Sequence, residues 1–236
     1  ITSKERNTMS KKYTNKSTIK MRDEDCEDCS NENSDLLGFT VKQKSFYNFN
    51  VHINTDIKAP DHYSKVFEML LDISEDDIVD FYIVSPGGRL DGLNVLLEGI
   101  RLTDAHTRAI LIGEASSAAS ILALNCSEVI VTNSAEMLCH HCLYSVGGKA
   151  ADISAHVDHT TKITEKLLQS TYEGFMNTHE LDLMLQGKQW YFDADEIRER
   201  LAQRDDYLEA KFLAEQEEMK AQQEQDEPKP KRKKKK

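Results

Sequence analysis

Apolar stretches about as long as a β-strand alternate in this chain with amphipathic stretches of helical period, and short polar turns separate them. The strand candidates are residues 49–54, 78–85, 108–113, 128–132 and 135–141, and the helix candidates among them are residues 60–74, 90–104 and 117–125. Alternating strands and helices over short connections are typical of a parallel sheet, because each helix returns the chain to the edge where the next strand begins. The pattern therefore predicts an α/β fold with a largely parallel sheet surrounded by helices.

Polar segments flank the part of the chain that carries this pattern. The chain has 236 residues, 39% of them hydrophobic, which is enough for one substantial core. Residues 1–44 and 204–236 are rich in charged and polar residues and bury too little apolar surface to fold alone. We expect one domain over residues 45–203, a disordered N-terminal segment and a charged C-terminal tail in which residues 206–225 are compatible with a helix.

Charge is unevenly distributed. The formal net charge is −11, although residues 229–236, KPKRKKKK, carry seven positive charges, so the rest of the chain sums to −18. An acidic body argues against nucleic acid as a partner of the domain itself. The basic end fits either a nucleic-acid or targeting segment or a solvated, disordered terminus.

The sequence also bears on the compartment. No apolar run approaches the roughly 20 residues of a membrane-spanning helix, and no secretory signal is visible. The cysteines are odd in number and the chain is not a small disulfide scaffold. We therefore expect a reducing, cytoplasmic setting and no membrane partner.

A long helical pattern covers residues 150–178. Its apolar positions recur near a period of 3.6 residues over about seven turns, which is long for a globular helix. The pattern fits a helix that stands partly away from the core and meets another subunit, and equally an ordinary surface helix.

Two turns at the predicted carboxyl ends of strands are candidates for chemistry, because active sites of open parallel sheets gather there. In VSPGGRLDG, Gly87 and Gly88 can adopt positive φ and direct free N–H groups at a ligand; a plain tight turn is the alternative. In IGEASSAAS, Ser116 or Ser117 lies where a helix begins, next to the unpaired N–H of Ala118. A serine that only caps this helix is the alternative.

Histidines and cysteines follow in the stretch CHHC. A serine nucleophile needs a base, and His140 or His141 can supply one; on a strand only one of them faces the serine. The chain's cysteines are Cys26, Cys29, Cys126, Cys139 and Cys142. A zinc site from Cys139 and Cys142 with the distant Cys26 and Cys29 is conceivable, but we expect Cys126 and Cys139 to be buried thiols and expect no metal.

Three blocks of the chain resemble the ClpP-type serine peptidases, the proteolytic subunits of ATP-dependent Clp proteases, including phage members that act in head maturation. FYIVSPGG is similar to the family's strand followed by Ser-Pro-Gly-Gly, and GEASSAAS is similar to its nucleophile turn. AEMLCHH followed by GGKAADI is similar to the histidine strand and the start of the handle helix. The resemblance spans roughly residues 50–203 and aligns the nucleophile with Ser117 and the base with His140, 140 − 117 = 23 positions later, so His141 would face away.

The resemblance implies a fold and a mechanism. The fold would be a spiral of ββα units related to the crotonase fold, with a long handle helix through which subunits form rings. His140 would take the proton of Ser117, the N–H groups of Gly87 and Ala118 would bind the oxyanion, and Gly88 would pair with an unfolded polypeptide substrate. The chemistry would need no cofactor, and ATP would be used only by a partner unfoldase.

One position departs from the family pattern. The family's aspartate aligns with Gln189, which can orient a histidine but cannot offset its positive charge; Asp193, Asp182 or Asp195 could substitute through a local shift. The segment that the family uses at its axial pore is not recognisable either. The alternatives to an active serine endopeptidase are therefore a catalytically impaired structural or regulatory paralogue, and a crotonase-like acyl-CoA enzyme.

Overall fold

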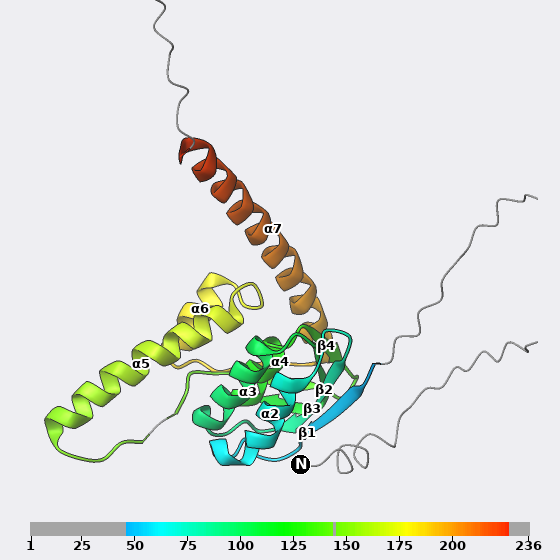
Figure 1. Cartoon of the computed structure of the whole chain (residues 1–236). Helices are drawn as coiled ribbons and strands as arrows, with labels where there is room; N and C mark the ends of the chain where they lie inside the picture. Colours follow the sequence, from blue (N-terminus) through cyan, green and yellow to red (C-terminus); the bar gives the residue numbers. More distant parts are fainter. Residues whose placement is uncertain (1–45, 144, 227–236) are drawn as a thin grey trace, which may run out of the picture.

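A computed structural model describes residues 46–143 and 145–226, and its ordered body is built on one mixed sheet (Figure 1). Within those residues the sheet has six strands in the order β1-β2-β3-β5-β6, with β4 paired to β3 beyond that path. All pairs are parallel except β5 with β6, which is antiparallel. The strands are β1 (Asn48–Ile53), β2 (Ile78–Ser85), β3 (His106–Ser116), β4 (Glu128–Val131), β5 (Glu136–Cys139) and β6 (Trp190–Phe192).

Helices connect the strands, as the alternating pattern predicts. They are the short 3-10 helix η1 (Pro60–Tyr63), α2 (Ser64–Asp72), α3 (Leu90–Leu102), α4 (Ala118–Leu124), α5 (Ala150–Tyr172), α6 (Thr178–Leu185) and α7 (Ala194–Asp226). Figure 1 shows α2, α3 and α4 side by side against the sheet. The expected α/β fold with a largely parallel sheet is confirmed.

The core lies between the sheet and these helices. Alternate residues of β2, namely Val79, Phe81 and Ile83, are fully buried, and every residue of α4 is buried. The intervening residue Asp80 is buried too, and the guanidinium of Arg108 on β3 donates two hydrogen bonds to its carboxylate, at 2.6 and 2.8 Å. A buried carboxylate requires such a partner, so this pair fixes β2 against β3.

The long helix α5 is shorter than its periodicity predicts. It ends at Tyr172 instead of residue 178, because the chain turns at Gly174, whose φ is +80°. Its buried residues, from Thr164 to Tyr172, all lie in its C-terminal part. The preceding turns extend away from the body (Figure 1), so the expectation that part of this helix stands clear of the core is confirmed.

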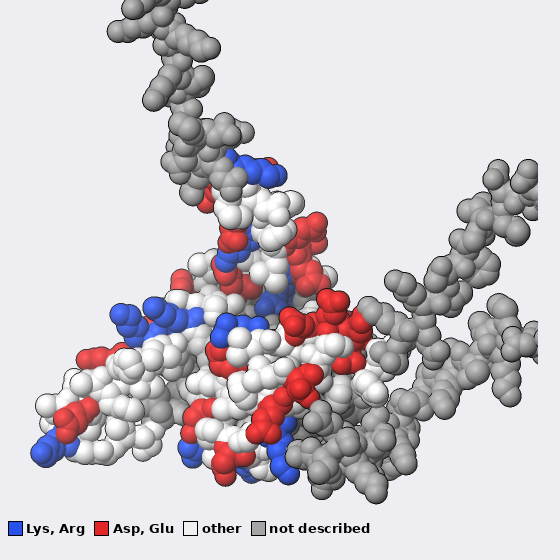
Figure 2. Space-filling model, viewed as in Figure 1, with Lys and Arg blue, Asp and Glu red and all other residues white. Residues whose placement is uncertain are grey.

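The last helix, α7, runs continuously from the body through position 203 into the charged segment (Figure 1). The helix expected over residues 206–225 is therefore confirmed as part of a longer one. Residues 1–45 and the basic run 229–236 lie outside the described residues, and the proposed domain limits at 44 and 203 stay predictions. On the face seen in Figure 2, acidic side chains are more widespread on the body than basic ones. No helix among the described residues is long and apolar enough to cross a membrane.

Candidate active site

The turn between β3 and α4 places Ser117 in a strained backbone conformation. Its φ of 55° and ψ of −122° make it the one non-glycine residue with positive φ in the described part of the chain. Such a conformation costs about 1–3 kcal/mol and persists only where the surroundings hold it. Here the Ser117 N–H donates to the carbonyl of Leu138 at 2.8 Å, and the Ser117 carbonyl accepts from the N–H groups of Ser120 and Ile121 at 3.0 and 3.2 Å.

The two serines of this turn differ in what their hydroxyls do. The buried Ser116 donates its hydroxyl to Glu114 Oε1 at 2.8 Å. Ser117 occupies the N-cap position of α4, yet its side chain makes no capping hydrogen bond, and it is only half-buried. Ser117 therefore occupies the N-cap position, as one of the two interpretations expects, but its hydroxyl does not cap the helix.

The Pro-Gly-Gly turn after β2 lies directly against this serine. Gly87 has φ +92°, and a Cβ atom added to it would lie 2.7 Å from Ser117 Cβ and 2.9 Å from the Ala118 nitrogen. Only glycine permits both this φ and this approach. Ala118 is the first residue of α4, so its N–H has no acceptor within the helix. The structure thus brings the glycine turn, Ser117 and the Ala118 N–H together.

The backbone hydrogen bonds of Gly87 and Gly88 differ from those expected. The Gly87 N–H donates to Ser85 Oγ at 3.1 Å, so the expectation that this group is a free oxyanion donor is corrected. Gly88 forms a parallel bridge with Ile57, in which the bonds are made by its neighbours, Gly87 C=O and Arg89 N–H. In such a bridge the central residue's own N–H and C=O face the opposite edge. Within the described residues the N–H and C=O of Gly88 are not used by this bridge, and its N–H is the donor that the geometry leaves available.

His140 follows the end of β5, next to the serine turn. Ser116 pairs with Leu138 in the parallel register, and the Ser117 N–H bonds to Leu138, so the two candidate residues come from adjacent chain segments. The imidazole Nε2 of His140 is buried and has no hydrogen-bond partner within residues 46–143 and 145–226. Burial lowers the pKa of His140, and the nearby His141 lowers it further. A neutral imidazole with an unpaired nitrogen is the state that a general base requires.

His141 has a different environment. The expected strand ends at Cys139, so both histidines lie just beyond it. The Nδ1 of His141 lies 3.1 Å from the backbone carbonyl of Cys142.

Gln189 directly precedes β6, the antiparallel partner of β5. The antiparallel register pairs Cys139 with Trp190, and one further step of the same register sets His140 opposite Gln189. The amide is exposed, and its Oε1 accepts a hydrogen bond from the Tyr191 hydroxyl at 3.1 Å. The position therefore suits a residue that orients the histidine, but the side chain in place is neutral.

Asp193 is not brought to His140. Its Oδ1 accepts from the N–H groups of Asp195 and Glu196 at 3.0 and 2.9 Å, and Glu196 returns a bond to the Asp193 N–H. This capping box starts α7. The sheet register sets Asp193 opposite Glu136, four residues or roughly 13 Å along β5 from His140.

The other two aspartates that were considered as substitutes also have different settings. Asp195 pairs with Arg198 at 2.6 Å on the surface of α7. Asp182 is exposed on α6.

The cysteines form no metal site in the described part of the chain, where no cluster of three His, Cys, Asp or Glu side chains could hold an ion. Cys26 and Cys29 lie outside the described residues. Cys126 and Cys139 are buried as predicted, and burial raises the pKa of each thiol to about 12. Burial likewise raises the pKa of Cys142 to about 11. These thiols therefore stay protonated and apolar in character.

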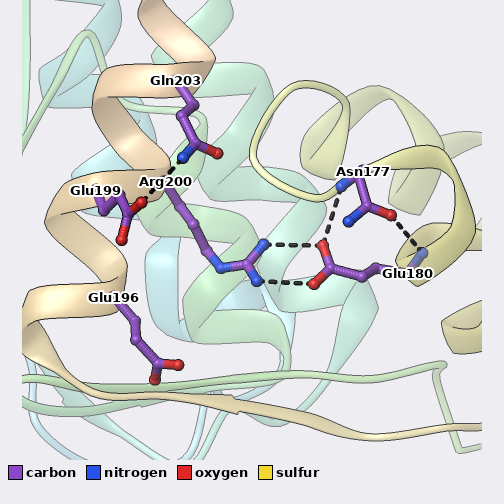
Figure 3. A pocket seen from close by; sticks show the side chains of 6 residues that line it. All are labelled: Asn177, Glu180, Glu196, Glu199, Arg200 and Gln203. Carbon is purple, nitrogen blue, oxygen red and sulfur yellow. Dashed lines mark hydrogen bonds and ion pairs between the residues drawn. The ribbon is translucent and has the colours of Figure 1, made fainter.

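A small cavity of about 170 Å³ is lined by Asn177 and by residues of α6 and α7, and Ser117 is not among the lining residues (Figure 3). Arg200 reaches across it and binds both carboxylate oxygens of Glu180 at 2.7 and 2.9 Å, and Arg200 holds the pKa of Glu180 below its usual range. Glu180 also completes a capping box with Asn177. The sequence analysis did not predict this ion pair and capping box, although the spacing Asn-x-x-Glu is a signal for the capping box.

Comparison with known proteins agrees with this geometry. No curated protein matches the chain. Residues 36–187 match the family model described as Clp protease, a span that contains Ser117 and His140 and ends two residues before Gln189. Because this match covers well over half of the sequence and the fold has the same layout, the chain belongs to the Clp protease family.

Proposed function

We propose that this chain is a serine endopeptidase of the ClpP type, in which Ser117 is the nucleophile and His140 the general base. The observation that carries the proposal is the state of Ser117: a strained backbone, a half-buried residue whose side chain makes no capping bond, and the glycine turn packed against it. Strain of this kind is retained where function requires it. The unpaired Nε2 of His140 supports the same assignment.

The proposed reaction uses protein groups alone. His140 takes the proton of Ser117 as the serine oxygen attacks the peptide carbonyl, and the same proton then goes to the leaving amine. Water, activated by His140, hydrolyses the acyl-enzyme. The N–H groups of Gly88 and Ala118 stabilise the oxyanion, and the C=O of Gly88 can accept from the backbone of the substrate.

The proposed substrate is an unfolded polypeptide, and the proposed working form is a ring. Members of the family generally form rings and act on polypeptides. The exposed part of α5 offers the surface for self-association, with Ile153, Val157 and Ile163 on turns that contain no buried residue. ATP would enter only through a partner unfoldase, and the cytoplasm remains the proposed compartment.

A second candidate is an impaired subunit that assembles with an active partner. Gln189 favours it, because an amide in place of the triad acid costs about 10⁴-fold in a serine protease. Robust hydrolysis by the purified protein would exclude this candidate. The acyl-CoA alternative gives no task to the strained Ser117 or to the unpaired imidazole, so we do not propose it.

A fluorophosphonate probe tests the assignment. The Ser117 oxygen attacks phosphorus, fluoride leaves, and His140 takes the proton; we expect labelling at Ser117, identified by peptide mass spectrometry. Ser117→Ala should abolish labelling and peptide hydrolysis, whereas Ser116→Ala, a matched change one residue away, should retain both. Folded wild-type protein that stays unlabelled would contradict the proposal.

A further inference from the structure

Two buried hydroxyls lie behind the nucleophile turn. Ser120, on the first turn of α4, is fully buried, and so is Tyr172, the last residue of α5. Ser120 Oγ and Tyr172 Oη are 2.7 Å apart. Neither residue takes part in the proposed reaction.

The hydroxyl of Ser120 is also bonded to the backbone of the site. It lies 2.7 Å from the carbonyl oxygen of Ser117 and 3.2 Å from that of Leu138. The same Leu138 carbonyl accepts the Ser117 N–H. One side chain therefore ties the nucleophile turn to the strand that leads to His140.

The direction of these bonds follows from the number of protons. Carbonyl oxygens only accept, so the single proton of Ser120 is given to the backbone. The Tyr172 hydroxyl must then be the donor to Ser120. Burial raises the pKa of Tyr172 well above its usual range, so the phenol keeps the proton that this role requires. The chain of bonds runs from Tyr172 through Ser120 to Ser117.

This chain of bonds acts at the strained residue. Two backbone N–H groups already bond to the Ser117 carbonyl at 3.0 and 3.2 Å, and the Ser120 hydroxyl makes the shortest of the three contacts. A carbonyl held in this way cannot rotate to relieve the φ of 55°. Holding the carbonyl also fixes the plane of the following peptide, whose N–H is that of Ala118.

We propose that Ser120 and Tyr172 are positioning residues, which hold Ser117 and the Ala118 N–H in the reactive arrangement without touching substrate. The inference rests on the proposed function and deepens it. It also means that the end of α5 is linked to the nucleophile by two side-chain hydrogen bonds.

The test measures the second-order rate of fluorophosphonate labelling together with its final stoichiometry and the melting temperature. Ser120→Ala should slow labelling about tenfold, as the loss of about one hydrogen bond implies, while the stoichiometry stays complete. This variant removes the Ser120 partner of the buried Tyr172 hydroxyl, which among the described residues keeps only its contact with the Cys139 side chain, and should therefore lose stability. Tyr172→Phe should have a smaller effect on rate, since Ser120 keeps its bond to Ser117.

The double variant Ser120→Ala/Tyr172→Phe separates positioning from stability. It removes both buried hydroxyls, so the melting temperature should recover relative to Ser120→Ala, yet labelling should stay slow. Ser127→Ala is the control, because it breaks a hydroxyl pair between the exposed Ser127 and the buried Thr107 at 3.1 Å, at the opposite end of β3 from Ser117; it should lose a little stability but not labelling rate.

The outcomes distinguish the two proposals. If the wild-type protein is labelled and Ser120→Ala and the double variant are labelled at the same rate, the positioning role is overturned. The peptidase assignment would then remain intact. A rate that recovers with stability in the double variant also overturns the positioning role, because the role would then be structural. No labelling of folded wild-type protein overturns the peptidase assignment, and this inference with it.

Discussion

The two ends of the β5–β6 pair differ in how their polar groups are satisfied. At one end the Asp193 carboxylate accepts hydrogen bonds from two backbone N–H groups, and the Asp193 N–H donates to the Glu196 carboxylate. At the other end the Nε2 of His140 has no partner among the described residues, and Gln189 has only the hydroxyl of Tyr191. Buried polar atoms in folded proteins are nearly always bonded. The end at Asp193 therefore serves the fold, whereas the unpaired imidazole at the other end is consistent with the proposed general base.

The largest effect is expected from removing the imidazole of His140. His140→Ala should slow labelling of Ser117 and peptide hydrolysis by about 10³-fold or more, because it removes the proposed base, and the neighbouring His141 has its Nδ1 beside the Cys142 carbonyl. The rate constants would be measured for folded protein, as judged by circular dichroism. His141→Gln is the matched control and should change the rate only a few-fold. Equal losses in the two variants would show that the base has been assigned wrongly.

The next test restores a charge at the same end. Gln189→Glu keeps the length of the side chain and supplies the carboxylate that can offset an imidazolium. Since the opposite replacement costs about 10⁴-fold in a serine protease, we expect hydrolysis to rise by roughly ten- to a hundredfold. Gln186→Glu makes the same charge change on an exposed position three residues earlier and should leave the rate unchanged. An equal rise in both variants would mean that net charge, and not position 189, is responsible.

At the Asp193 end, a substitution should lower stability and leave the rate of hydrolysis unchanged. Asp193→Ala removes the cap of α7 and should lower the free energy of unfolding by about 1 kcal/mol, measured by urea denaturation. Hydrolysis by the folded fraction should be unchanged, because Asp193 lies four residues along the sheet from His140. A large loss of rate with normal stability would make Asp193 the missing acid after all.

The sequence predicts the fold well where the pattern is local and regular. The strands around Phe81, Leu111 and Met137 and the helices between them carry strong periodicity, and each is present. The choice of Ser117 and His140 came from family resemblance and not from periodicity, which left Ser116 and His141 equally open. The structure separates the two serines by physical criteria, since one hydroxyl is bonded and the other is not.

The rest could not be predicted because it depends on tertiary contacts. The sequence could not show that the Gly87 N–H is bonded to Ser85, because that bond depends on how the turn folds back on β2. Likewise, Asp193 is a plausible acid by sequence distance. Because β6 has only three residues and α7 starts directly after Asp193, this carboxylate caps α7. The end of α5 at Tyr172 was missed because the apolar period continues past the turn.

The smallest expected effect concerns the pH dependence at the His140 end. The neutral imidazole is the base, so labelling should rise with pH through the pKa of His140 and level off above it. Burial and the charge of His141 both lower this pKa, so the midpoint should lie below the ordinary value of 6.5. His141→Gln removes the second cause but leaves burial, the larger one, so the midpoint should move up and still remain below 6.5. His159→Gln, on the exposed part of α5, is the control and should not move it. A midpoint that stays fixed in His141→Gln would show that the two histidines do not interact, and one above 6.5 in the wild-type protein would mean that an anionic partner, and not burial, dominates at His140.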